Sequence, residues 1–279
     1  MENSNDQTLK RAINGDIVAF QTLFSGFQNQ LKSYLYRLLT DRNDVEDLTH
    51  DTFVKAFDKI GTFKGQSSLK TWVFQIATNM AYDHLKRYKR WSADAQDMSK
   101  ALALGDRSVY DTINSVSYAS GEEAYDMREH IDFCFTCLSK TLPIEQQVAL
   151  ILKDVYDFSV KEIMEILDNT EGVVKHLLIN ARKTMTTIFD HRCALINKNG
   201  VCNQCSELNG VHNPKQNQQA ALMKLELVKA SKKFNKEELY DLRTKLVQNI
   251  DPLRSKGSDL QDIIMKCTRK AIGEIETLN

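Results

Sequence analysis

Helix breakers are scarce in this chain, and their scarcity limits the folds that it can adopt. The 279 residues include 3 prolines and 11 glycines. Because proline and glycine are the residues that most disfavour a helix interior, a chain poor in both favours helices. Hydrophobic residues make up 42% and charged residues 27% of the sequence, which is typical of a globular protein and argues against a disordered chain. We therefore expect an all-α protein.

Apolar residues recur with helical spacing in the first part of the chain. Over residues 44–60 they share one face, while acidic residues and His50 occupy the other. A loop follows, and Ser67 or Ser68 can cap the next helix. That helix ends in residues 82–91, which interleave cations with aromatic rings. This segment is either a contact for phosphates and unstacked bases or a solvated helix end whose cations complement the helix dipole.

Residues 128–190 have the pattern of a helix-turn-helix. Pro143 stands where a helix would begin, and Ser159 and Glu162 have the spacing of a capping box. A break at residues 168–170 then separates a short helix from a longer one. Side chains that can reach phosphates or base edges in a major groove lie on the longer helix: Lys175, His176, Asn180, Arg182 and Lys183. The alternative interpretation is an ordinary helical hairpin.

The formal net charge is zero, with 37 basic and 37 acidic residues, but the charges are unevenly distributed. Residues 1–90 carry 13 basic and 10 acidic residues, whereas residues 91–137 carry 3 and 9. Residues 138–190 carry 6 and 8, and residues 191–279 carry 15 and 10, so two acidic segments lie between two basic ones. The acidic stretch 92–127 is rich in small polar residues and weakly periodic, and we expect it to be a flexible linker.

The helical segment that precedes the acidic stretch and the helix-turn-helix that follows it, in this order, resemble bacterial RNA polymerase sigma factors of the small extracytoplasmic-function (ECF) group. The resemblance covers residues 8–190 and is carried by AINGDIVAFQTLF, DVEDLTHDTFVKAF, FKGQSSLKTWVFQIATNMAYDHLKR, LPIEQQVALILKDVYDFSVKEIMEIL and TEGVVKHLLINARKTM. It implies a region 2 bundle over residues 8–91 and a region 4 helix-turn-helix over residues 128–190. It also implies a protein that binds core RNA polymerase, recognises the minus-thirty-five and minus-ten promoter elements, and melts DNA to initiate transcription.

The resemblance assigns three groups of site residues. The core polymerase contact corresponds to Asp47, His50, Asp51 and Phe53. The minus-ten contact corresponds to Phe63, Lys64, Gly65, Gln66, Ser67, Asn79, Asp83, Lys86 and Arg87. The minus-thirty-five contact corresponds to Thr170, Lys175, His176, Asn180, Arg182 and Lys183. Leu177 and Asn180 stand where the family usually has arginine, so we expect weak minus-thirty-five binding.

Three cysteines form a candidate metal site in residues 191–213, which we name the cysteine knuckle. Cys193, Cys202 and Cys205 flank an Asn-Gly hairpin signal. Three thiolates with a histidine, either His191 or His212, would suit tetrahedral zinc. A redox-responsive thiol cluster and plain thiols are the alternatives, and we expect no cofactor to be required beyond this candidate zinc.

The other cysteines have a second interpretation. Cys134 and Cys137 share an apolar helical face and are expected to be core thiols. They could instead join Cys202 and Cys205 in one four-thiolate site. Cys267 is expected to pack inward on the last helix.

Residues 214–279 lie beyond the resemblance and are expected to form a helical extension. Its helices are predicted near residues 216–233, 236–249 and 258–274. The extension could add DNA affinity through its lysines or regulate the protein in place of a separate inhibitor.

Motifs of enzymatic chemistry are missing, including a phosphate-cradling glycine loop and a nucleophile elbow, so we expect no enzyme. The polar N-terminus and the lack of a long apolar run predict a cytoplasmic protein without a membrane span. An anti-sigma factor is an open candidate partner. The alternative function is a helix-turn-helix regulator that works without core polymerase and responds to metal or redox state through its cysteines.

Overall fold

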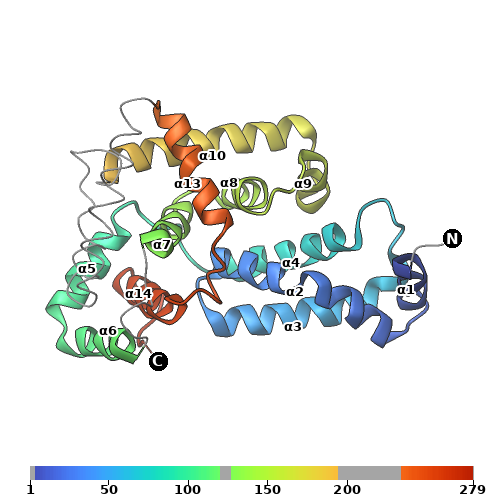
Figure 1. Ribbon diagram of the computed structural model, residues 1–279, viewed down its shortest axis with the longest axis horizontal. Coiled ribbons are helices and arrows are strands. Elements are labelled where there is room, and N and C mark those ends of the chain that lie inside the picture. The colour runs from blue at the N-terminus through green and yellow to red at the C-terminus, as the bar shows by residue number, and fades with distance from the viewer. Residues whose placement is uncertain (1–3, 120–126, 194–233, 279) are drawn as a thin grey trace.

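Helices make up the regular structure throughout the described part of the chain. The computed structural model describes residues 4–119, 127–193 and 234–278 (Figure 1). The all-α prediction is confirmed. The elements are α1 (Ser4–Ile13), α2 (Ile17–Leu39), α3 (Arg42–Lys59), the 3-10 turn η1 (Ile60–Thr62), α4 (Leu69–Leu85), α5 (Ala95–Gly105), α6 (Arg107–Ala119), α7 (Met127–Ser139), α8 (Ile144–Leu150), the π-helical segment η2 (Ile151–Val155), α9 (Val160–Leu167), α10 (Glu171–Arg192), α13 (Lys236–Gln248) and α14 (Ser258–Ala271).

Side-chain caps begin several helices where the sequence predicts them. The hydroxyl of Ser68 accepts a hydrogen bond from the backbone of Thr71 at the start of α4, at 3.0 Å. Ser159 and Glu162 form the predicted capping box of α9. Asn235 opens α13 as the predicted cap. Each cap satisfies backbone N–H groups that would otherwise lack a partner, and so places the helix start.

The N-terminal bundle (α1–α4, residues 4–91) and the helix-turn-helix unit (α7–α10, residues 127–193) share one apolar core. Aromatic rings join them, with Phe74 of α4 lying 4.9 Å from Phe158 between ring centroids. Tyr34 of α2 meets Tyr156 edge-on at 6.1 Å. Burial of such rings is a major source of stability, so the two units form a single packed body.

Residues 95–119 depart from the flexible linker that the sequence predicts. They form α5 and α6, whose apolar side chains Ala103, Val109 and Ile113 are buried in a second core. The other half of this core comes from α14, through Leu260 and Ile264. The apolar positions of α5 and α6 are sparse among small polar residues, and a helix far along the chain is needed to cover them. The local sequence therefore gives little sign of their order.

Residues 234–278 of the extension are described, and their helix α14 lies between the α5–α6 pair and the N-terminal bundle (Figure 1). Helix α13 packs against α7, α10 and η2, and α14 packs against α5, α6 and α7. The predicted helices at residues 236–249 and 258–274 are confirmed as α13 and α14, whereas the predicted helix at residues 216–233 lies outside the described residues. None of the described helices has the length and apolar character needed to cross a membrane.

Candidate nucleic-acid interface

An acidic face of α3 is open to solvent. Asp47, His50 and Asp51 are all exposed, and their spacing places them on one side of the helix. Val54 lies one turn further along and is 43% exposed. Phe53, which the sequence groups with them, instead packs its ring 5.2 Å from that of Phe24. The three polar residues of the predicted polymerase contact thus lie together on the exposed side of α3, whereas Phe53 packs against the core.

The predicted minus-ten loop connects η1 to α4. Gly65 has a φ of +67°, a left-handed conformation that favours glycine, and it turns the loop back towards α4. Phe63 is 9% exposed and rests 5.4 Å from the ring of Trp72, so it anchors the loop. Lys64 and Gln66 are exposed on either side of the turn, and Ser67 is half-buried. The loop borders a cleft of about 360 Å³.

Two acidic residues of the helix-turn-helix unit complete that cleft. Glu165 on α9 and Asp168 at its end line the cleft together with the loop. Helix α9 is held there because Gln75 of α4 donates to the carbonyl of Glu165 at 2.8 Å. The sequence does not reveal this neighbourhood, since the two segments are far apart along the chain.

The exposed end of α4 carries the remaining minus-ten residues. Asn79, Asp83, Lys86 and Arg87 are exposed, as a nucleic-acid contact requires. Lys86 Nζ lies 2.8 Å from Asp83 Oδ1, and this hydrogen bond lowers the pKa of the Asp83 carboxyl. Arg87 contacts His84 Nδ1 at 2.7 Å. The cations are therefore positioned by neighbours on their own helix and still face solvent.

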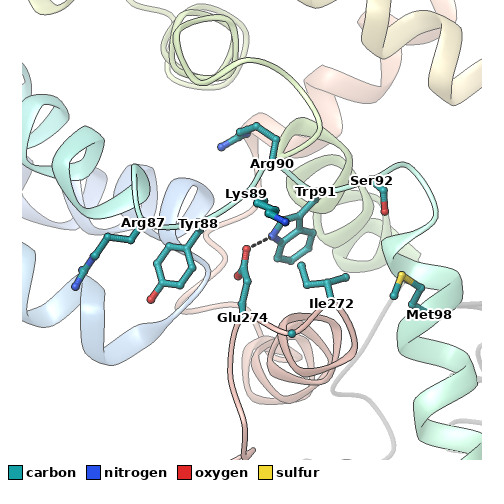
Figure 2. Close-up of a pocket in the computed structure, with 10 residues that line it drawn as sticks. Arg87, Tyr88, Lys89, Arg90, Trp91, Ser92, Met98, Ile272 and Glu274 are labelled. Carbon is teal, nitrogen blue, oxygen red and sulfur yellow. Dashed lines mark hydrogen bonds between the residues drawn. The ribbon is translucent and has the colours of Figure 1, made fainter.

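Residues 82–91, which interleave cations with aromatic rings, become less exposed towards the end of the segment. Trp91 is 4% exposed, and its indole N–H donates to Glu274 at 2.6 Å (Figure 2). Lys140 Nζ lies 4.7 Å above the same ring. Arg90 donates to the carbonyl of Leu142 at 2.6 Å, and burial lowers its pKa to about 10. Residues 90–91 thus pack against other parts of the chain, while residues 86–87 remain in solvent.

The predicted recognition helix is α10. The Thr170 hydroxyl caps it, accepting from Val173 N at 3.5 Å, so this side chain has a structural role here. Lys175 and Lys183 are exposed, as is His176. The half-buried amide of Asn180 lies 3.2 Å from the His176 ring nitrogens.

Two cations of the predicted contact are already paired within the chain. Lys175 Nζ lies 2.6 Å from Glu171 Oε1 on the exposed side of the helix. Arg182 makes a two-pronged contact with the Asp154 carboxylate at 2.5 and 3.0 Å, and these hydrogen bonds raise the pKa of Arg182. Asp154 also accepts from the hydroxyl of Tyr240 at 3.0 Å. Arg182 therefore has a buried partner within the chain, although the sequence predicts that it contacts a phosphate.

Two apolar side chains on α10 were not singled out from the sequence. Ile179 is 64% and Val173 is 43% exposed. Exposed apolar side chains on a recognition helix can contact thymine methyl groups in the major groove. Ile179 lies three or four residues from Lys175, His176 and Lys183, and Val173 lies three residues before His176; this spacing is the signal that places them on the same side.

The described cysteines are buried. Cys193 is 7% exposed and accepts a hydrogen bond from Arg243 at 2.7 Å. Cys134 and Cys137 are core thiols as predicted, and Cys267 packs inward with its Sγ 3.5 Å from the carbonyl of Ser99.

Cys202, Cys205, His212 and the rest of the cysteine knuckle beyond residue 193 lie outside the described residues. Among those that are described, no three potential ligands gather at one point. Zinc therefore stays a prediction, and elemental analysis of protein purified without chelator tests it.

Two family models match segments of this chain. A family model described as Sigma-70 region 2 matches residues 23–91, and one described as Sigma-70, region 4 matches residues 132–185. The ECF RNA polymerase sigma-E factor of Haemophilus influenzae is 28% identical over 183 residues, covering 65% of this chain and 94% of that protein. The RNA polymerase sigma-H factor of Pseudomonas aeruginosa is 23% identical over 184 residues, covering 66% and 93%.

A solved structure of the sigma factor RpoE in complex with the anti-sigma factor NepR from Bartonella quintana is also similar. It is 21% identical, covers 61% of this chain and 96% of that chain, and has a TM-score of 0.43. The fold and its exposed basic and acidic faces define an all-helical protein with a helix-turn-helix unit and separate charged surfaces. The two family matches, in this order, and the similarity to the two sigma factors together support an ECF sigma factor of the sigma-70 family. Helices α13 and α14 lie outside both matched segments.

Proposed function

We propose that this protein binds core RNA polymerase, recognises the minus-thirty-five and minus-ten promoter elements, and melts the DNA to initiate transcription. The observation that carries the proposal is the presence of both sigma regions in family order on one chain. The relatives' own names, which describe RNA polymerase sigma factors, support it.

Charge and exposure support a separate surface for each of the three proposed contacts. The acidic face of α3, at Asp47, His50 and Asp51, would bind the polymerase. The loop at Lys64 and Gln66 would hold an unstacked base of the minus-ten element. Taking a base out of the stack costs a few kcal/mol, which a shaped loop and nearby phosphate contacts can offset. The exposed side of α10 would read the minus-thirty-five element in the major groove.

Run-off transcription is the direct test. Core polymerase with this protein, incubated with genomic DNA fragments, should yield discrete transcripts that core polymerase alone does not make. Mapping the transcript starts would then identify the promoter elements. A chain that fails to bind core polymerase at low salt would contradict the proposal and favour a regulator that acts without polymerase.

Substitution on α3 tests the polymerase contact itself. Asp47→Asn and Asp51→Asn should each weaken core binding by about tenfold, equivalent to about 1.4 kcal/mol, if each carboxylate meets a cation of the polymerase. The free energy of unfolding should change by less than about 0.5 kcal/mol, since both side chains are exposed. Asp111→Asn, an exposed carboxylate on α6, is the control for net charge and should leave affinity unchanged. Equal affinities for all three variants would place the contact elsewhere.

A further inference from the structure

Helix α10, every residue of which is described, has no arginine without an ion-pair partner, and an isoleucine stands on its exposed side. We propose that Ile179 reads the minus-thirty-five element through the 5-methyl group of thymine. The base that this helix selects in the major groove is then thymine rather than guanine. The inference rests on the proposed sigma function, because it names the base feature that the recognition helix reads.

Ile179 lies in the middle of the solvent-facing side of α10 and is 64% exposed. Lys175 and Lys183 lie about one turn before and after it, and His176 lies three residues before it, so all four share one side of the helix. In a helix that enters the major groove, this side faces the base edges, while cations at its borders contact phosphates. The placement therefore brings an apolar side chain to the bases.

Guanine is most often read by arginine, and both arginines of α10 bind carboxylates of this chain. Arg182 contacts Asp154 at 2.5 and 3.0 Å, and the side chain of Asp154 is only 7% exposed. Arg192, at the far end of the helix, donates to Asp97 at 2.6 Å. Turning Arg182 towards DNA would leave a buried carboxylate without its cation, which is strongly unfavourable. An arginine contact to guanine is therefore not available on this helix.

The two positions at which the family usually has arginine also favour A·T pairs. Leu177 is partly buried and packs against the main core. The amide of Asn180 lies 3.2 Å from both ring nitrogens of His176, and this pair borders Ile179. Asparagine is the side chain that pairs with the N6 and N7 atoms of adenine. Because adenine pairs with thymine, Asn180 and Ile179 suit the two strands of the same kind of base pair.

The thymine methyl group is the apolar feature that the major groove offers to such a side chain. Contact with isoleucine removes the methyl group from water, and burial of one such group strengthens binding by about fourfold. Uracil pairs as thymine does but lacks this methyl group. Replacement of thymine by uracil therefore measures the proposed contact without changing the base pairing or the charge of the DNA.

The first test replaces each thymine of the duplex by uracil, one position at a time. The duplex is the minus-thirty-five element located by run-off mapping; if the chain does not bind core polymerase, it is the sequence that the full chain enriches from random duplex DNA. Wild-type affinity, measured by fluorescence anisotropy at low salt, should fall by about fourfold at one or more thymines. An element without thymine, no enriched sequence, or no loss at any thymine would overturn the proposal.

The second test compares Ile179→Ala with its matched control Val18→Ala. Both residues are 64% exposed, and Val18 lies on α2, away from the recognition helix. Truncation at such exposed positions should leave the fold intact. Ile179→Ala should bind the thymine and uracil duplexes within twofold of each other, whereas Val18→Ala should keep the fourfold difference. A full uracil penalty in Ile179→Ala would overturn the assignment to this residue.

The third test uses Ile179→Arg, with Val18→Arg as the control for added charge. Ile179→Arg should lose the uracil penalty and favour guanine in a selection from random duplex DNA, because a guanidinium at this position can reach guanine O6 and N7. Each variant adds one cation, so a change in overall affinity at low salt does not by itself support the proposal. Retention of the thymine preference by Ile179→Arg would mean that residue 179 does not face the bases, and would overturn the proposal.

Binding of the wild-type chain to core polymerase is measured alongside these tests. Loss of that binding with a uracil penalty retained would refute the sigma function and leave the thymine contact standing. Binding to polymerase without any uracil penalty would have the opposite meaning. The two failures are therefore distinguishable.

Discussion

On one side of the N-terminal bundle, α3 presents charged side chains to solvent, whereas on another side α2 buries Arg37 against the helix-turn-helix unit and the extension. Asp47 and Asp51 are exposed, but Arg37 is fully buried and paired. A charge in water is available to a partner at little cost, while a buried charge is committed to the groups around it. The open side is thus suited to binding other molecules, and the covered side to holding this molecule together.

The largest effect is expected at the covered side, from Arg37→Ala. The substitution leaves the Asp132 carboxylate buried without its partner, which should reduce the free energy of unfolding by about 3–5 kcal/mol. Urea denaturation followed by circular dichroism measures the loss. Arg107→Ala removes an exposed arginine and should change stability by less than about 0.5 kcal/mol. Similar losses in the free energy of unfolding would contradict the distinction between buried and exposed charges.

A smaller effect, dependent on pH, is expected from Lys140. Burial lowers the pKa of its ammonium group to about 7, with Glu274 opposing the shift and Arg90 reinforcing it. Its Nζ donates to the carbonyl of Leu38 at 3.0 Å and so joins α7 to α2. Above pH 7 the folded state has released this proton, but the unfolded state retains it up to about 10.5.

The unfolded state therefore binds more protons in this window, and stability should rise with pH. The slope from this one group is at most about 1.4 kcal/mol per pH unit. Urea denaturation between pH 7 and pH 9 should show a steeper rise for wild type than for Lys140→Met. Parallel curves would mean that Lys140 keeps its proton in the folded state.

The smallest effect is expected on the open side, from Lys86→Gln. Lys86 has a side chain 74% exposed, and its proposed partner is a phosphate of the melted strand. Loss of one such contact should flatten the dependence of log affinity on log salt by about 0.7 for single-stranded DNA. Anisotropy titrations at several salt concentrations measure the slope. Lys245→Gln, an exposed lysine of α13, should leave it unchanged, and an identical change in both variants would reduce the effect to net charge.

Much of the local structure is predictable, because its causes are local. Ser68, Ser159 and Asn235 cap the helices that the sequence predicts for them, since a cap bonds to backbone groups two or three residues away. The helix-turn-helix is predictable for the same reason. The predicted contacts on α3 and α10 are mostly exposed, because the polar sides of amphipathic helices face solvent.

Where the structure differs from these predictions, the cause is a partner that is distant in sequence. The order of α5 and α6 depends on α14, and the burial of Trp91 depends on Glu274, 183 residues further along. Phe53 shows the same limit on a smaller scale: its helix is predictable, but its role depends on the rings that α2 places beside it.

The sequence by itself determined most of the helices, several of their caps, the resemblance to sigma factors and the separation of charge along the chain. These properties arise within a few turns of helix or from motifs in a fixed order. Only the tertiary structure decided which charges are covered. Arg37 meets Asp132 across 95 residues and Ile250 across 213, and no local pattern encodes such pairings. Burial makes these contacts decisive, since a charge removed from water must find its partners wherever the packed helices bring them.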